Sequence, residues 1–94
     1  MTNVKDTLAQ RGNRYGRMDR NALLTQTLMD EVAVAAIRSG QVLTPMHKEC
    51  LHMIMGKVSR MVCGDQFYAD NPHDIAGYAT LLEEYINNIN AEEE

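Results

Sequence analysis

Residues 44–64 read TPMHKECLHMIMGKVSRMVCG and have the features of one complete α-helix. Thr44 is a favoured N-cap residue, and Pro45 suits the first helical position because the N–H that proline lacks is not needed there. Apolar side chains recur every three or four residues, so they share one side of a helix. They are Leu51, Met55, Val58 and Val62. Gly64 ends the pattern, and we therefore expect a helix from Pro45 to the residue before this glycine.

Similar features lie on both sides of this segment. Residues 20–39 carry another apolar stripe and end before Gly40, a residue type that stops helices. A third long helix is expected from Asn71, which suits an N-cap and precedes a proline; its stripe comprises Ile75, Tyr78, Leu82, Tyr85 and Ile89. A short helix is expected over residues 3–11, ended by Gly12. The sequence therefore predicts an all-α fold, a small bundle of three long helices and a short N-terminal helix.

Length and composition limit the class of protein. The chain has 94 residues, which suits a single domain over residues 1–94 with one modest core. Because the core is small and the helices are rich in methionine, we expect oligomerisation to complete the bundle. The acidic end, residues 91–94, is expected to be disordered.

The sequence also gives expectations about the compartment. No apolar run is long enough to span a membrane, and the N-terminus lacks the apolar block of a secretory signal. Cys50 and Cys63 would lie about 20 Å apart on one helix, too far for a mutual disulfide. Together these features predict a cytoplasmic protein, in the host cytoplasm if the chain is phage-encoded.

Charge is distributed unevenly along the chain. The net charge is −4, which argues against binding to duplex nucleic acid, yet residues 11–20, RGNRYGRMDR, carry four arginines and one acid. Guanidinium groups pair with phosphate oxygens through two hydrogen bonds, an aromatic ring can stack on a base, and glycine lets a ligand approach the backbone. The candidate nucleotide-binding residues here are Arg11, Arg14, Tyr15, Gly16 and Asn21. The alternative is a solvated turn with surface arginines and a buried tyrosine.

Two further pairs of charged residues are candidates for the same site. Lys57 and Arg60 lie three residues apart, hence on one helix face, among apolar neighbours. They either bind an anion or form salt bridges with the acidic last helix. Asp70 and Asp74 lie one turn apart at the start of that helix, where they suit a divalent cation or are simply stabilised by the helix dipole.

The order and spacing of these motifs resemble a small, uncharacterised family of phage and prophage proteins. The resemblance rests on R-x3-YG from Arg11, K-x-x-R from Lys57 and D-x3-DIAGYA from Asp70, and it covers about residues 4–86. That family is in turn distantly similar to the MazG-like all-α nucleoside triphosphate pyrophosphatases.

The second resemblance implies an activity and a cofactor. The MazG-like enzymes are helical bundles, usually dimers or tetramers, which hydrolyse nucleoside triphosphates to monophosphates and pyrophosphate with Mg²⁺ held by helix carboxylates. It implies that Asp70 and Asp74 hold the metal and that Asp74 and Lys57 are catalytic. The first acidic motif of that group corresponds to residues 30–31, and its third acid is replaced by Val34.

Three functions follow as hypotheses. The first is a Mg²⁺-dependent nucleoside triphosphate pyrophosphohydrolase. The second is a protein that binds or sequesters a nucleotide, or another phosphate-bearing small molecule, without turnover. The third is a small phage protein that binds and inhibits a host protein. We expect a homo-oligomer in every case.

Overall fold

Four α-helices make up residues 3–93, the part of the chain that this computed structural model describes. They are α1 (Val4–Tyr15), α2 (Met18–Arg38), α3 (Pro45–Cys63) and α4 (Asp70–Glu93). No strand is present among these residues, which confirms the predicted all-α class. No helix in the described part is both long and apolar enough to cross a lipid bilayer.

The N-termini of α1 and α3 are held by side-chain caps, and that of α3 is the one predicted from the sequence. Thr44 Oγ1 accepts a hydrogen bond from the His47 backbone N–H at 3.1 Å. Asn3 Oδ1 accepts one from the Asp6 backbone N–H at 2.9 Å. Each cap satisfies a backbone donor that has no partner within the first helical turn, and this fixes where the helix begins.

Two helix ends near the N-terminus differ from expectation. α1 passes through Gly12 and ends at Tyr15, and Gly16, with φ +79°, follows it. A glycine inside a helix costs only about 1 kcal/mol, so Gly12 does not have to end α1. α2 begins at Met18, slightly before the expected start.

The last helix is longer than expected at both ends. α4 begins at Asp70, so Asn71 lies inside the helix as a fully buried side chain and does not cap it. At the other end α4 includes residues 91–93, where disorder was expected, while Glu94 lies outside the described residues. Alanine and glutamate are good helix formers, which is consistent with the longer helix.

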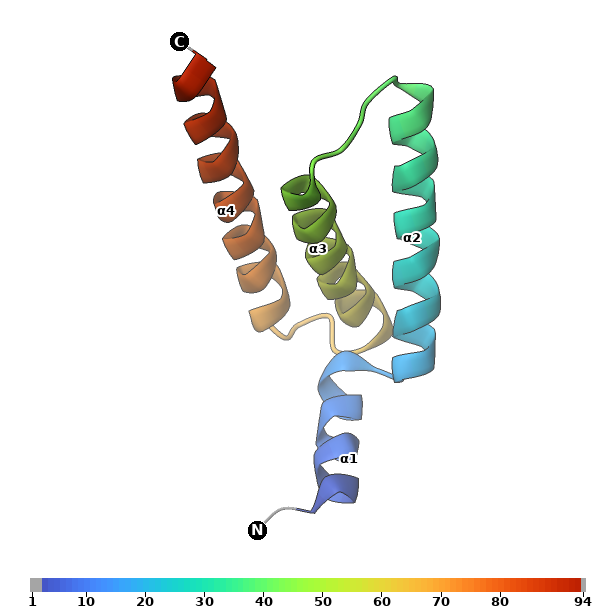
Figure 1. Cartoon of the computed structure of the whole chain (residues 1–94). Helices are drawn as coiled ribbons and strands as arrows, with labels where there is room; N and C mark the ends of the chain where they lie inside the picture. Colours follow the sequence, from blue (N-terminus) through green and yellow to red (C-terminus); the bar gives the residue numbers. More distant parts are fainter. Residues whose placement is uncertain (1–2, 94) are drawn as a thin grey trace.

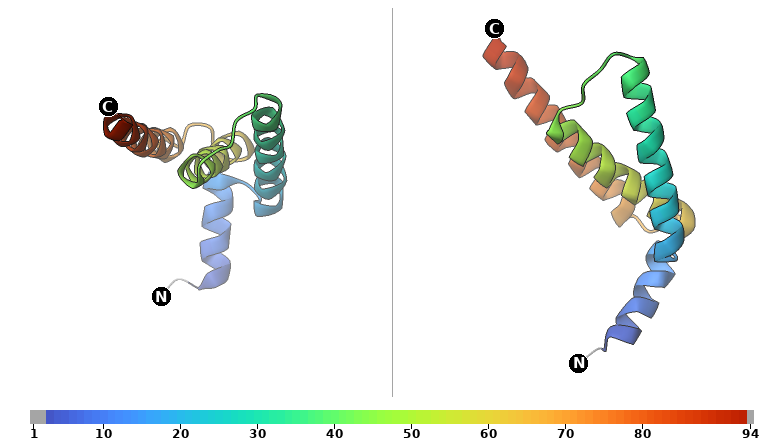
Figure 2. Two further views of the ribbon diagram at one scale, coloured as in Figure 1. Left: turned by 45° about the horizontal axis from the view of Figure 1, so that its top comes forward. Right: turned by 45° about the vertical axis from the view of Figure 1, so that its right-hand side comes forward.

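The three long helices form an open row with α3 in the middle (Figure 1). α3 packs against both α2 and α4, which do not contact each other anywhere in the described chain. α1 projects away from this row, and the two ends of the chain lie far apart (Figure 2). The molecule measures 53 × 27 × 23 Å, so it is elongated and has little interior.

Small and polar side chains take the most buried positions. Cys50, 3% exposed, is the only apolar residue buried to this degree in the described part; the buried polar residues are Asn21, Thr25, Ser59 and Asn71. Thr25 Oγ1 donates to Ser59 Oγ at 2.8 Å, and Ser59 Oγ donates to the Met55 backbone oxygen at 3.0 Å. This chain of buried hydroxyls joins α2 to α3.

We expect Ser59→Ala to destabilise the protein by about 1–3 kcal/mol, because it leaves the buried Thr25 hydroxyl without an acceptor. Such a loss lowers the melting temperature of a domain of this size by about 4–8 °C per kcal/mol. Thr27→Val is the matched control, since the Thr27 hydroxyl makes only an exposed bond to the Leu23 backbone oxygen. Equal melting temperatures for the two variants would contradict the role assigned to the buried pair.

Candidate functional site

Two glycines allow the backbone of the turn between α1 and α2 to lie directly against the C-terminus of α3. Gly16 has positive φ, and a Cβ there would overlap the Cys63 carbonyl oxygen. A Cβ on Gly64 would lie 2.5 Å from the Arg14 carbonyl oxygen and 2.7 Å from the Gly16 nitrogen. Only hydrogen at both positions permits this approach of one backbone to another. The Asp65 N–H donates to the Arg14 carbonyl at 3.1 Å and closes the junction.

Three cationic or aromatic side chains gather at this junction around Tyr15. The Arg60 guanidinium carbon lies 4.8 Å from the Tyr15 ring centroid, and that of Arg11 lies 5.5 Å from it. Tyr68 meets the same ring edge to face, with centroids 5.8 Å apart. Cation–π contacts of this kind orient guanidinium groups while leaving their N–H donors available to a ligand. Tyr15 therefore links an arginine of α1 to an arginine of α3.

Two adjoining cavities form a groove on this side of the molecule. One, of about 360 Å³, lies among α1, α2 and α3; the other, of about 240 Å³, lies between α2 and α3. They share Met18, Asn21 and Arg60. We call the combined cavity the α1–α3 groove. Its charged or titratable lining residues are Arg11, Arg17, His52, Lys57 and Arg60.

The α1–α3 groove is positive although the protein as a whole is negative. None of its lining residues is Asp or Glu, whereas the whole chain has a net charge of −4. Among the described residues no carboxylate lies within salt-bridge distance of Arg11 or Arg60. Arg17, in contrast, is held by two hydrogen bonds to Asp19, at 2.7 and 3.1 Å. The two free guanidinium groups are the natural binding groups for an anion.

Asn21 gives the groove a polar group of fixed orientation. Its Nδ2 donates to the Tyr15 backbone oxygen at 2.5 Å, which requires the amide nitrogen, and not the oxygen, to face that carbonyl. Its Oδ1 is buried and has no partner among the described residues. A buried acceptor without a donor is costly, so this oxygen favours a ligand N–H or a bound water.

The carboxylates that the resemblance assigns to Mg²⁺ have partners in the protein. Asp74 forms an ion pair with Lys57, whose side chain is only 14% exposed, at 2.9 Å. A hydrogen bond with the Asp70 carboxylate, and then one with Tyr15, raises the pKa of Tyr68 to about 12. Asp74 is therefore engaged by an ion pair within the chain.

The structure offers few protein ligands for a Mg²⁺ ion near Asp70 and Asp74. Mg²⁺ requires near-octahedral coordination by oxygen ligands, including one or two free carboxylates. Residues 3–93 contain no group of three or more His, Cys, Asp or Glu side chains that could share a metal ion. The second acidic pair, residues 30–31, lies on α2, which does not contact α4.

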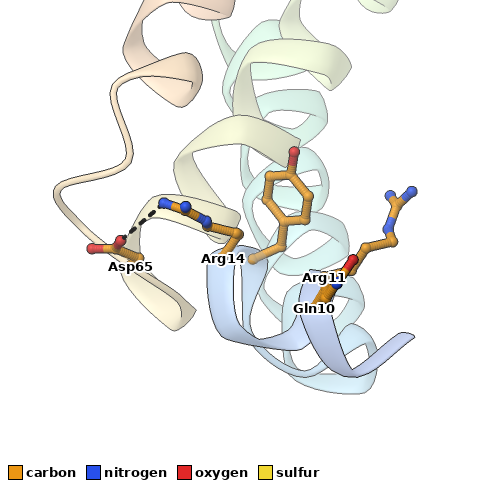
Figure 3. A pocket seen from close by; sticks show the side chains of 5 residues that line it. Gln10, Arg11, Arg14 and Asp65 are labelled. Carbon is orange, nitrogen blue, oxygen red and sulfur yellow. Dashed lines mark ion pairs between the residues drawn. The ribbon is translucent and has the colours of Figure 1, made fainter. Parts of the chain in front are cut away.

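Arg14 lies in a different place from the other predicted ligand residues. It turns toward Asp65, 3.9 Å away, while Arg11 extends in the opposite direction (Figure 3). Its guanidinium also covers the Tyr68 ring, 4.7 Å from the centroid. Arg14 lines a neighbouring, wide hollow with Gln10, Arg11, Tyr15 and Asp65; this hollow shares Arg11 and Tyr15 with the α1–α3 groove, which Arg14 itself does not line.

The structure thus brings together most of the predicted nucleotide-binding residues. Neither predicted metal ligand lines the groove, although Asp74 forms an ion pair with Lys57, which does. Those that line the groove are Arg11, Tyr15, Gly16, Asn21, Lys57 and Arg60. The sequence-based argument missed Met18 and Met53 as lining residues, and it missed Gly64 as the partner of Gly16. An apolar residue at a helix start or a glycine after a helix carries no specific signal of a site. No known protein family, curated protein or solved structure matches this chain.

Proposed function

We propose that this protein binds a phosphorylated small molecule of the nucleotide class in the α1–α3 groove, without a metal ion and without turnover. The observation that carries the proposal is the charge of the groove. Four cationic side chains and no carboxylate line it on a protein of net charge −4. Arg17 and Lys57 are paired with Asp19 and Asp74, so the positive charge of the groove comes from Arg11 and Arg60. A positive cavity on an acidic surface selects anions by charge and attracts them at long range.

The lining suits both parts of a nucleotide. Arg11 and Arg60, which have no ionic partner among the described residues, suit the phosphate oxygens. Met18 and Met53 provide polarizable apolar surface for a planar base. Asn21 Oδ1 suits an N–H on the edge of that base.

Binding is favoured over hydrolysis because the chain offers few free carboxylates to hold Mg²⁺. The pyrophosphohydrolase implied by the resemblance needs Mg²⁺ held by several acids, whereas Asp74 is paired with Lys57 and no three acidic, histidine or cysteine side chains of residues 3–93 could share a metal ion. Lys57 is accordingly proposed as a groove cation that Asp74 positions, in place of the catalytic role that the resemblance gives it.

Thermal melts with and without a chelator test this proposal. The probes are ATP, dATP, GTP, AMP and a cyclic nucleotide, each with Mg²⁺ and with EDTA. A ligand present at about 100 times its Kd stabilises a protein by about 2.7 kcal/mol, a rise of several degrees for a chain of this size. We expect at least one nucleotide to raise the melting temperature equally with Mg²⁺ and with EDTA, and no phosphate or pyrophosphate to be released.

Two results would contradict the proposal. If no nucleotide shifts the melting temperature under either condition, the groove is not a nucleotide site. If the shift requires Mg²⁺ and a phosphate-release assay detects product, the protein is a hydrolase, as the resemblance implies.

A further inference from the structure

A glycine inside α3 lines the α1–α3 groove although the packing of the protein does not require it. Gly56 lies in the interior of α3 and lines the cavity of about 240 Å³ between α2 and α3. A Cβ added there would have no heavy atom within 4 Å, so no neighbouring element needs a hydrogen in its place. Alanine is the better helix former at an interior position. The space above Gly56 is therefore open to a ligand, which can lie directly against the helix backbone.

The surroundings of Gly56 suit a flat ring with a polar edge. Met18 of α2 and Met53 of α3 line the same cavity, and their flexible thioether side chains adapt to the face of a ring. Met18 is 76% exposed, so a bound ring removes apolar surface from water. Asn21, 6% exposed, also lines this cavity, and its Oδ1 has no hydrogen-bond partner among the described residues. A heteroaromatic ring that carries an N–H group complements all of these features.

A buried hydrogen bond fixes the width of this cavity. Thr25 lines the cavity, and its hydroxyl donates to that of Ser59 at 2.8 Å, which ties α2 to α3. Ser59 follows Gly56 by three residues and therefore lies on the same side of α3. The two helices cannot separate at this level without breaking the buried bond. A side chain at position 56 would therefore take space from a ligand and would not widen the cavity.

The position of Arg60 sets the direction of the ligand. Arg60 follows Gly56 by four residues, which places it on the same side of α3 and about 6 Å further along the helix. It lines both parts of the groove, and Arg11 lines the part next to α1. The cavity between α2 and α3 is smaller than the roughly 300–1,000 Å³ of sites that hold a whole small molecule. It therefore suits one end of a ligand whose charged end lies beside the two arginines.

We propose that the cavity between α2 and α3 is a base subsite, in which a flat heteroaromatic base lies against the backbone of Gly56 and the phosphates extend toward Arg60 and Arg11. This inference rests on the proposed function and adds the place and direction of the base. Gly56 is the specificity-determining residue, because a Cβ at this position would occupy the space of the ring. Gly77 of α4 has equally open surroundings, but the hollow beside it is lined by α4 alone. Gly77 therefore provides a matched control.

Calorimetric titration of two ligands tests the subsite. The first is the nucleotide that gives the largest thermal shift, and the second is the inorganic phosphate, pyrophosphate or tripolyphosphate with the same number of phosphorus atoms. We expect wild-type protein to bind the nucleotide at least about 10-fold more tightly than the inorganic ion, since only the nucleotide has a base to bury.

Three variants locate the base. Gly56→Ala is expected to weaken nucleotide binding by about 10-fold or more, the effect of one methyl group in a filled pocket, and to leave binding of the inorganic ion unchanged. Met18→Ala, at an exposed side chain, is expected to weaken nucleotide binding alone by about 3- to 10-fold. Gly77→Ala is expected to change neither affinity. Both glycine variants are expected to raise the melting temperature by about 2–8 °C, because alanine stabilises a helix interior.

The outcomes separate the subsite from the proposed function. A Gly56→Ala protein that is more stable than wild type yet binds the nucleotide more weakly supports the subsite. Equal wild-type affinities for the nucleotide and the inorganic ion overturn it and leave the groove as an anion site. Wild-type nucleotide affinity in Gly56→Ala also overturns it, and Met18→Ala decides in the same way if Gly56→Ala does not fold. If wild-type protein binds no nucleotide, the proposed function itself fails, and the subsite fails with it.

Discussion

Gly16→Ala is expected to detach the α1–α2 turn from α3 and to lower the melting temperature by more than about 10 °C. The added methyl group would overlap the Cys63 carbonyl oxygen, and φ +79° disfavours any residue with a Cβ. Left-handed backbone costs about 1–2 kcal/mol, and forcing a methyl group into a filled space costs about 1–3 kcal/mol more. Thermal unfolding followed by circular dichroism measures the loss.

Gly64→Ala tests the other side of the same contact. Its Cβ would meet the Arg14 carbonyl oxygen at 2.5 Å, so we expect a loss of similar size. Gly12→Ala is the control, because a Cβ at Gly12 has no heavy atom within 4 Å and alanine favours a helix by about 0.5–1 kcal/mol. A wild-type melting temperature for Gly16→Ala would contradict the close approach of the two backbones.

Arg60→Gln is expected to weaken nucleotide binding by about 10- to 100-fold while leaving the fold intact. A charge-assisted hydrogen bond contributes about 1.5–3 kcal/mol, and each 1.4 kcal/mol is tenfold in affinity. Arg60 is the cation that both cavities share, and its guanidinium is already placed over Tyr15. It makes no salt bridge within the described chain, so its removal leaves no carboxylate unpaired.

Isothermal titration with the nucleotide that gives the largest thermal shift measures this effect. Arg38→Gln is the matched control, since Arg38 is an exposed arginine in the last turn of α2 and does not line the groove. Equal affinities for Arg60→Gln and Arg38→Gln would place the ligand outside the α1–α3 groove. Unchanged melting of the unliganded Arg60→Gln protein would separate lost binding from lost stability.

Most of the fold was predictable from local patterns. The stripe and cap of residues 44–64 predicted α3 within a residue at each end, because Thr44, Pro45 and Gly64 each restrict the backbone on their own. The errors in the predicted helix boundaries occurred at residue types that occur both at the ends of helices and inside them. Gly12 was expected to end α1 and lies inside it, and Asn71 was expected to cap α4 and is buried. Local sequence does not distinguish these uses.

The candidate site was predictable as a set of residue types but not as a place. Arginine, tyrosine and lysine at helical spacings indicated an anion, and these residues do line one groove. Asp70 and Asp74 looked equally available, yet Lys57 forms an ion pair with Asp74. Whether a charged group is free or paired depends on neighbours distant in the chain, which spacing along one helix does not reveal.

The sequence by itself therefore determined the helices and their main boundaries, because capping and amphipathic spacing act over a few residues, and it supplied the residue types of the proposed anion site. Only the tertiary structure decided which cations remain free, that Gly16 meets Gly64, and that α2 and α4 stay apart. These features depend on contacts between segments up to about 50 residues apart, whose energies no local pattern encodes.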